Sequence, residues 1–203
     1  MKNKKKTNIP VMPGLEDRSP NDLSDRLEFE ELSRGTIRID DSIDEFNTTD
    51  YMRKIGYVVN KGVKNIKFLI TSPGGSVYHA LALYDRLVSL KNVGVKTEAY
   101  VEGMAASAAS MIVLQGIEKR YATANARFLI HEPRRWTMFA RETVSNMQDE
   151  TQEMVALSEV VYGIMAKRCK LSKQELSKLI TRKEIWLSSS EAKKIGLIDA
   201  IVQ

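Results

Sequence analysis

Apolar and polar residues alternate along this chain in blocks of two different periods. The pair Ile37 and Ile39 and the apolar run of residues 66–70 are typical of strands. Residues 51–59, between them, space apolar side chains three and four apart, as on one face of a helix. Further elements are expected downstream: a helix that ends near Lys91, a strand over residues 95–101, a small-residue helix over residues 105–114 and a short buried strand over residues 128–130. Alternating strands and helices predict an α/β fold with a largely parallel sheet.

Two helices have apolar faces that can be assigned residue by residue. The face of the helix after residue 76 comprises Val77, Ala80, Leu81, Tyr84, Leu87 and Val88. A longer helix is expected over residues 141–167, which lack proline, and its stripe comprises Val144, Met147, Met154, Val155, Val161 and Met165. This helix is long for one small domain, so we expect it to project. Its stripe belongs either to the core or to a contact with a partner subunit.

The first 22 residues are expected to form an arm. They combine lysines with three prolines and a glycine, a composition that resists regular structure. Four of the five net positive charges of the chain lie within its first six residues, so the basic character belongs to the arm and does not indicate a nucleic-acid surface. A helix is expected over residues 23–32, and one domain over residues 23–203.

The C-terminal part contains two helix-start signals. Ser172 with Glu175, and Ser188 with Glu191, have the spacing of capping boxes, in which a serine and a glutamate each bind the backbone of the other. They predict two further helices. Gly196 and a final strand over residues 197–202 follow the second.

Composition limits the class of protein. A chain of 203 residues with 43% apolar and 28% charged residues fits a soluble globular protein. Its apolar runs are too short to cross a bilayer, so we expect no membrane association. Cys169 is the single cysteine, which excludes an intrachain disulfide or a thiolate metal cluster and favours a reducing, cytoplasmic location.

Ser107 is the first candidate for chemistry. It lies in the block GMAASAAS of residues 103–110, after an expected strand and at the start of an expected helix. Small neighbours permit the tight turn that exposes a nucleophilic hydroxyl. A helix of alanine and serine packed closely against the sheet would explain the same residues.

His131 is the second candidate. It follows the buried run of residues 128–130 and precedes Glu132 and Pro133, so it emerges where a strand ends and the chain turns. Sites in α/β folds gather at such strand ends, and an imidazole there can accept a serine proton near neutral pH. A satisfied, partly buried histidine is the alternative. The other histidine, His79, matches no such context.

Gly74 and Gly75 follow the strand of residues 66–70 and leave amides that can face an anion. One interpretation is an oxyanion hole, completed by the amide of Ala108 directly after Ser107. A phosphate or CoA pyrophosphate cradle and an ordinary turn are the other two interpretations.

Four sequence blocks together resemble one family. They are ITSPGGSV (residues 70–77), GMAASA (103–108), ANARFLIHEP (124–133) and WLSSSEA with GLID (186–192 and 196–199). In this order, over about residues 24–202, they resemble the proteolytic subunit of the Clp protease. The resemblance implies a ClpP/crotonase-like α/β fold of repeated β-β-α units with a projecting long helix.

The resemblance also implies roles for single residues. Ser107 corresponds to the nucleophile of a serine endopeptidase, His131 to the base, and Gly75 and Ala108 to the backbone donors of the oxyanion hole. The third catalytic residue of the family is usually an aspartate two positions before the aromatic that aligns with Trp186; this chain has Glu184 there. A glutamate can also orient an imidazole. Asp199 is another carboxylate, in a context that is structural in the family.

The same resemblance implies an assembly and partners. It predicts self-assembly into two stacked heptameric rings, a homo-oligomeric tetradecamer that encloses the sites. A Clp-type AAA+ ATPase would feed unfolded protein substrates to it. That partner alone would use ATP, because this chain lacks a phosphate-binding GxxxxGK motif, and we expect no metal or cofactor here. Two alternatives remain: a catalytically inactive scaffold subunit, suggested by Glu184, and a crotonase-type enzyme that acts on a CoA thioester.

Overall fold

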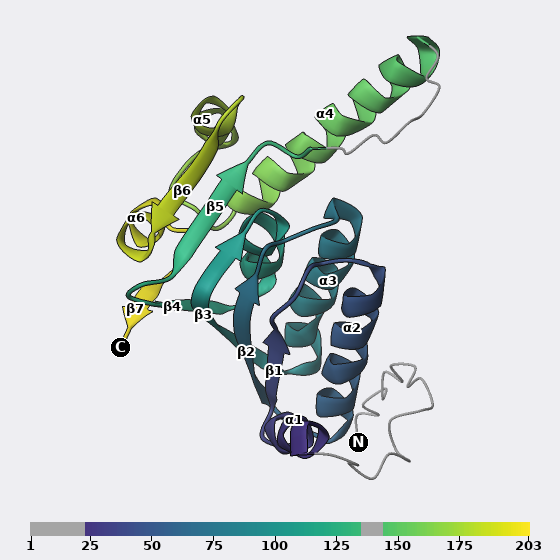
Figure 1. The fold of residues 1–203 in the computed structure, drawn as a ribbon, viewed down its shortest axis with the longest axis vertical. Coiled ribbons are helices and arrows are strands. Elements are labelled where there is room, and N and C mark those ends of the chain that lie inside the picture. Colours follow the sequence, from purple (N-terminus) through teal and green to yellow (C-terminus); the bar gives the residue numbers. More distant parts are fainter. Residues whose placement is uncertain (1–22, 135–143) are drawn as a thin grey trace, which may run out of the picture.

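A computed structural model describes residues 23–134 and 144–203, which build a seven-stranded sheet and its covering helices (Figure 1). The strands are β1 (Thr36–Ile39), β2 (Asn65–Ser72), β3 (Lys96–Ala106), β4 (Lys119–Thr123), β5 (Arg127–His131), β6 (Glu184–Ser188) and β7 (Ala200–Val202). The helices are α1 (Leu23–Ser33), α2 (Glu45–Asn60), α3 (Val77–Ser89), α4 (Val144–Ala166), α5 (Lys173–Ile180) and α6 (Ser189–Ile195). Short helical turns cover Leu90–Val93, Ala109–Val113 and Leu114–Gly116.

Strand β3 organises the sheet because it has three parallel neighbours. It pairs with β2 along most of its length, with β4 through residues 98–101, and with β5 through residues 104–106. β1 and β7 extend the parallel ladder beside β2 and β4, whereas β6 runs antiparallel to β5. The carboxyl ends of β2, β3 and β5 therefore meet at one edge, where α/β folds place their sites.

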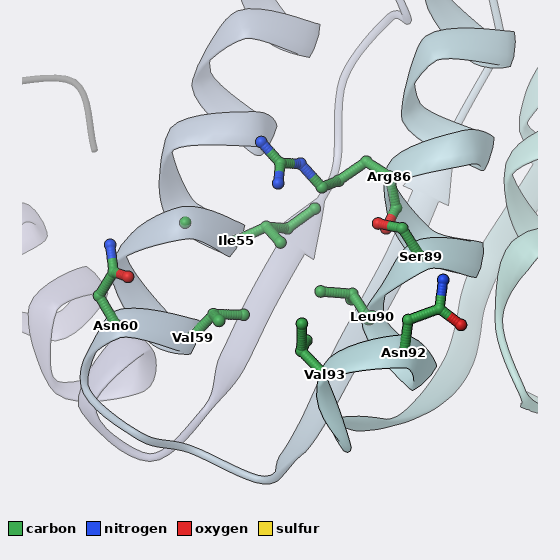
Figure 2. Close-up of a pocket in the computed structure, with 9 residues that line it drawn as sticks. Ile55, Val59, Asn60, Arg86, Ser89, Leu90, Asn92 and Val93 are labelled. Atoms are coloured by element: carbon green, nitrogen blue, oxygen red, sulfur yellow. The ribbon is translucent and has the colours of Figure 1, made fainter. Parts of the chain in front are cut away.

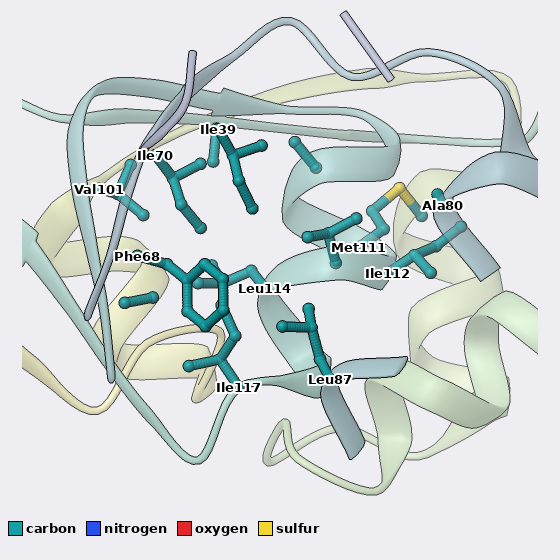
Figure 3. Packing of buried hydrophobic residues seen from close by; sticks show 14 of the residues in the cluster. Ile39, Phe68, Ile70, Ala80, Leu87, Val101, Met111, Ile112, Leu114 and Ile117 are labelled. Atoms are coloured by element: carbon teal, nitrogen blue, oxygen red, sulfur yellow. The ribbon is translucent and has the colours of Figure 1, made fainter. Parts of the chain in front are cut away.

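The core lies between this sheet and the helices packed on it (Figure 3). Strand β2 shows why its sequence forms a strand: Ile66, Phe68 and Ile70 are buried, whereas Lys67 and Leu69 between them are more exposed and face the other side. Figure 3 shows Phe68 beside Leu114 and Ile117, so the short helical turns after β3 contribute to the same core. Each such side chain stabilises the fold by about 1.5–3 kcal/mol.

Helix α4 is partly core and partly exposed. Leu157, Val161 and Met165, in its C-terminal half, are buried, whereas Met147 and Val155 are 55% and 60% exposed. Figure 1 shows the N-terminal half extending beyond the body of the protein. Neither α4 nor any other helix within the described ranges is long and apolar enough to span a membrane.

The predicted α/β class, the largely parallel sheet and both capping boxes are confirmed. The predicted helix of residues 23–32 is α1, and the long helix is observed from Val144 to Ala166. Residues 141–143 and the predicted arm of residues 1–22 lie outside the described residues.

Four details of the prediction are wrong. The helix expected over residues 105–114 begins later, because residues 104–106 are still paired with β5 and helical turns start at Ala109. The buried face of α3 includes Leu83 and omits Val88, which is 40% exposed. Strands β4 and β6 were not expected, and the final strand is only Ala200–Val202, since Leu197 and Ile198 are buried in the core before the ladder begins.

Candidate active site

Ser107 occupies a sharp turn at the end of β3. Its φ of 54° lies in the left-handed region, which costs a residue with a side chain about 1–3 kcal/mol. The backbone is held on both sides: the Ser107 amide donates to the Leu129 carbonyl at 2.9 Å, and its carbonyl accepts from the Met111 amide at 2.9 Å. The Ser110 hydroxyl also donates to the Leu129 carbonyl, at 2.7 Å. These bonds hold the turn that presents the Ser107 side chain, as the nucleophile-elbow interpretation requires.

The glycine turn after β2 packs directly against this serine turn. Gly74 has a φ of 88°, and a Cβ atom built on it would lie 2.8 Å from Ser107 Cβ and 2.9 Å from the Ala108 nitrogen. Such distances are shorter than ordinary contacts between these atoms. Only a residue without a side chain allows the two turns to approach this closely, which explains the glycine at position 74.

His131 reaches Ser107 from the end of β5. Because Ala106 pairs with Leu129, the last residue of β5 extends past the end of β3 toward the serine turn. Its Nε2 lies 2.8 Å from Ser107 Oγ. Its Nδ1 lies 2.5 Å from the carbonyl oxygen of Glu132. When Nδ1–H donates to that carbonyl, Nε2 carries the lone pair that can accept the serine proton. The structure thus brings together the two residues proposed as nucleophile and base.

Two backbone amides are available beside the serine. The Ile43 amide donates to the Gly74 carbonyl and the Ser76 amide donates to the Ile43 carbonyl, each at 2.8 Å, so both bonds bypass the Gly75 amide. Within the described residues, that amide has no hydrogen-bond acceptor. The Ala108 amide directly follows Ser107. Paired donors next to a nucleophile can stabilise a negatively charged oxygen.

Glu184 lies opposite His131 in the antiparallel ladder between β5 and β6. Its carboxylate, however, forms an ion pair with Arg134 Nη1 at 2.7 Å, and its side chain is 48% exposed. The orienting role inferred for Glu184 remains a prediction, because the group at His131 Nδ1 is a backbone carbonyl.

A second carboxylate near the site, that of Glu132, binds a backbone amide. The Glu132 side chain accepts a hydrogen bond from the Arg182 amide at 2.7 Å, which supports a turn in which Arg182 has a φ of 56°. Neither Glu132 nor Arg134 was expected to be a site residue from the sequence, although Glu132 directly follows His131 and Arg134 lies three positions after it.

Asp199 belongs to a separate, structural ion pair. Burial works against its charged form, but hydrogen bonds from the Arg120 side chain and amide outweigh burial and hold the pKa of Asp199 below its usual value. Its Oδ1 accepts from Arg120 Nη2 at 2.5 Å, and the Arg120 side chain is only 3% exposed. The structural interpretation of this aspartate is consistent with these contacts.

A cavity of about 250 Å³ lies away from this site, between the C-terminal ends of α2 and α3 (Figure 2). Its lining is apolar inside and polar at the rim, and comprises Ile55, Gly56, Val59, Asn60, Arg86, Ser89, Leu90, Asn92 and Val93. The serine and glycine turns lie near the opposite, N-terminal end of α3, which begins directly after Ser76. The cavity is therefore not part of the candidate site.

Comparison with known proteins shows which family the chain belongs to. The model of the Clp protease family matches residues 22–203. The chain is 26% identical to the ATP-dependent Clp protease proteolytic subunit 1 of Protochlamydia amoebophila over 98% of this chain and 95% of that protein. It is 28% identical to the ATP-dependent Clp protease proteolytic subunit of Cyanophora paradoxa over 89% of this chain and 93% of that protein. It is 27% identical to subunit 1 of Chlamydia trachomatis serovar D, over 89% and 92% of the two chains.

Proposed function

The chain belongs to the Clp protease family, and we propose that it is a Clp proteolytic subunit in which Ser107 and His131 hydrolyse peptide bonds. The observation that carries this proposal is the 2.8 Å contact between Ser107 Oγ and His131 Nε2, next to the glycine turn. The family and its ClpP/crotonase-like α/β fold agree with a peptidase. The serine mechanism and its residues are our proposal.

The proposed reaction follows from the contacts of the two side chains. His131 Nε2 takes the Ser107 proton while Oγ attacks the carbonyl carbon of the peptide, and a tetrahedral intermediate forms. The Gly75 and Ala108 amides donate to its negatively charged oxygen. The imidazolium then returns the proton to the leaving amine, and an acyl-enzyme remains on Ser107. Water, activated by the same imidazole, releases the second product and restores the serine.

The imidazole needs support on its other nitrogen. The Glu132 carbonyl at 2.5 Å from Nδ1 supports the tautomer that leaves Nε2 free to accept a proton. We propose that Glu184, opposite His131 in the ladder, adds a negative charge that stabilises the imidazolium during turnover. No metal or cofactor enters this mechanism.

Assembly and partners complete the proposal. We infer a homo-oligomer of two stacked heptameric rings, cytoplasmic, that receives unfolded protein from a Clp-type AAA+ ATPase. The exposed Met147 and Val155 on the projecting half of α4 support a subunit contact there. ATP hydrolysis belongs to the partner in this proposal, because the chain contains no GxxxxGK motif.

Hydrolysis of a short fluorogenic peptide tests the proposal. The wild type and Ser107→Ala are compared alone and with a Clp ATPase, and a fluorophosphonate probe reports covalent labelling of Ser107. We expect labelling and turnover in the wild type and neither in Ser107→Ala, with unchanged assembly, because the variant removes a single oxygen atom. Full turnover in Ser107→Ala would contradict the proposal, as would CoA binding in calorimetry without peptidase activity.

The ion pair between Glu184 and Arg134 favours one second candidate, an inactive scaffold subunit. In that case the fluorophosphonate probe does not label Ser107 in the assembled wild-type protein.

A further inference from the structure

Glu184 is placed to contact His131 but contacts another residue. The two residues face each other directly in the antiparallel ladder, so their side chains share one face of the sheet with Cβ atoms about 4.5–5.5 Å apart. A glutamate carboxylate can reach an imidazole nitrogen across that distance. In the structure the carboxylate binds Arg134 Nη1 at 2.7 Å, and the Glu132 carbonyl occupies His131 Nδ1.

The two acceptors differ in what they supply to catalysis. A neutral carbonyl selects the tautomer of the imidazole, whereas a carboxylate also stabilises the positive charge that develops on the ring during proton transfer. Hydrogen bonds between charged groups are roughly twice as strong as neutral ones. A histidine held by the carbonyl alone is therefore competent but slower.

Of the carboxylates near His131, Glu184 is the one that is able to act on the imidazole. Glu132 follows His131, but its side chain already accepts from the Arg182 amide at 2.7 Å. Helix α4 contributes Tyr162 and Glu159 near Glu132: burial, and then the charges of Glu132 and Glu159, raise the pKa of Tyr162. Among the described residues, Arg134 is the cation that binds the Glu184 carboxylate.

We propose that Arg134 is a positioning residue that withholds Glu184 from His131, so that the serine–histidine pair rests in a slower state until the carboxylate exchanges Arg134 for the imidazole. This inference depends on the proposed serine mechanism. The exchange needs little rearrangement, since both side chains are about half exposed, at 54% and 48%, and exposed ion pairs contribute little to stability. The described state is the resting state of this switch.

The test uses Arg134→Gln, which removes the cation and keeps a polar side chain. The rate of fluorophosphonate labelling of Ser107 and of peptide hydrolysis is measured across pH in the assembled protein. We expect the plateau rate to rise about tenfold, as a charged hydrogen bond replaces a neutral one. The acid limb of the profile should move to higher pH, because a carboxylate beside the imidazole favours its protonated, inactive form.

Matched variants separate positioning from a general charge effect. Arg134→Lys keeps the cation and should show a much smaller rise. Arg53→Gln removes the same charge from an exposed position on α2 and should leave the acid limb in place. In the double variant Arg134→Gln/Glu184→Gln the rise should disappear, because no carboxylate remains to exchange.

Failure of this inference is distinguishable from failure of the proposed function. If Ser107 is labelled equally fast in the wild type and in Arg134→Gln, the switch is overturned and the serine mechanism stays intact. The same conclusion follows if the rise in rate persists in the double variant that lacks the Glu184 carboxylate. Ser107 that stays unlabelled in every variant overturns the serine mechanism and the switch together.

Discussion

The close approach of the glycine turn to the serine turn can be tested by adding one methyl group at Gly74. In Gly74→Ala the new Cβ atom would meet Ser107 Cβ at 2.8 Å and the Ala108 nitrogen at 2.9 Å. Carbon atoms prefer separations of about 3.5–4.0 Å. The serine turn must therefore move by several tenths of an ångström to about 1 Å, which displaces Ser107 and the Ala108 amide together.

The expected loss of stability has two parts. A residue with a Cβ atom pays about 1–2 kcal/mol for the left-handed backbone that Gly74 adopts. Overpacking against the serine turn adds about 1–3 kcal/mol. A shift of about 1 Å in a catalytic group costs on the order of 10²-fold in rate. We therefore expect Gly74→Ala to lower the free energy of unfolding by about 2–5 kcal/mol and kcat/KM by about 100-fold.

Gly62 offers a matched control for the backbone part alone. Its φ of 81° is close to the 88° of Gly74, but a Cβ atom there meets nothing within 4 Å. Gly62→Ala should therefore destabilise the protein by about 1–2 kcal/mol and leave turnover unchanged.

Urea unfolding of both variants gives the change in the free energy of unfolding, and hydrolysis of a fluorogenic peptide gives the change in kcat/KM. Equal stabilities and equal rates for Gly74→Ala and Gly62→Ala would refute the packing of the glycine turn against the serine turn. A normal rate in a strongly destabilised Gly74→Ala would show that the turns touch without positioning Ser107.

Three further predictions address other contacts. In the Arg134→Gln background, Glu184→Gln should lower kcat by about tenfold, because the freed carboxylate that stabilises the imidazolium becomes an amide; an unchanged kcat there would exclude Glu184 from turnover. Asp199→Asn should lower stability at neutral pH because it leaves the buried Arg120 without its counter-ion. The lowered pKa of Asp199 means that this aspartate stabilises the fold above its ordinary value of 3.8, and that the contribution is lost as pH falls through the still lower folded value. Wild type and Asp199→Asn should thus converge in acid unfolding, and a constant difference down to the lowest pH would contradict the ion pair. Val155→Glu should weaken assembly while the subunit stays folded, since this side chain is 60% exposed on α4; sedimentation that still reports the wild-type oligomer would contradict a contact there.

Local signals in the sequence predicted the parts of the fold that depend on neighbouring residues. Both serine–glutamate capping boxes form as expected, because each needs only residues three apart. The apolar run of residues 66–70 predicted the strand β2, and the burial of Ile66, Phe68 and Ile70 follows the two-residue period of a strand.

Features that depend on residues far away in the sequence were not predicted. Strand β4 carries Lys119 and Arg120, and its short run has no apolar alternation long enough to mark a strand; it forms because β3 and β7 lie on either side. The helix expected from residue 105 starts later because β5 pairs with residues 104–106.

The candidate site divides in the same way. The order of four sequence blocks was enough to single out Ser107, His131 and the glycine turn, because residue type and local turn chemistry determine which groups can attack, accept a proton or donate from the backbone. Only the tertiary structure decided that Ser107 and His131 lie 2.8 Å apart and that Glu184, in register with His131, is paired with Arg134. The strength of an ion pair depends on distance in space, and Arg134 and Glu184 lie 50 positions apart in a sequence that carries no local signal of that distance.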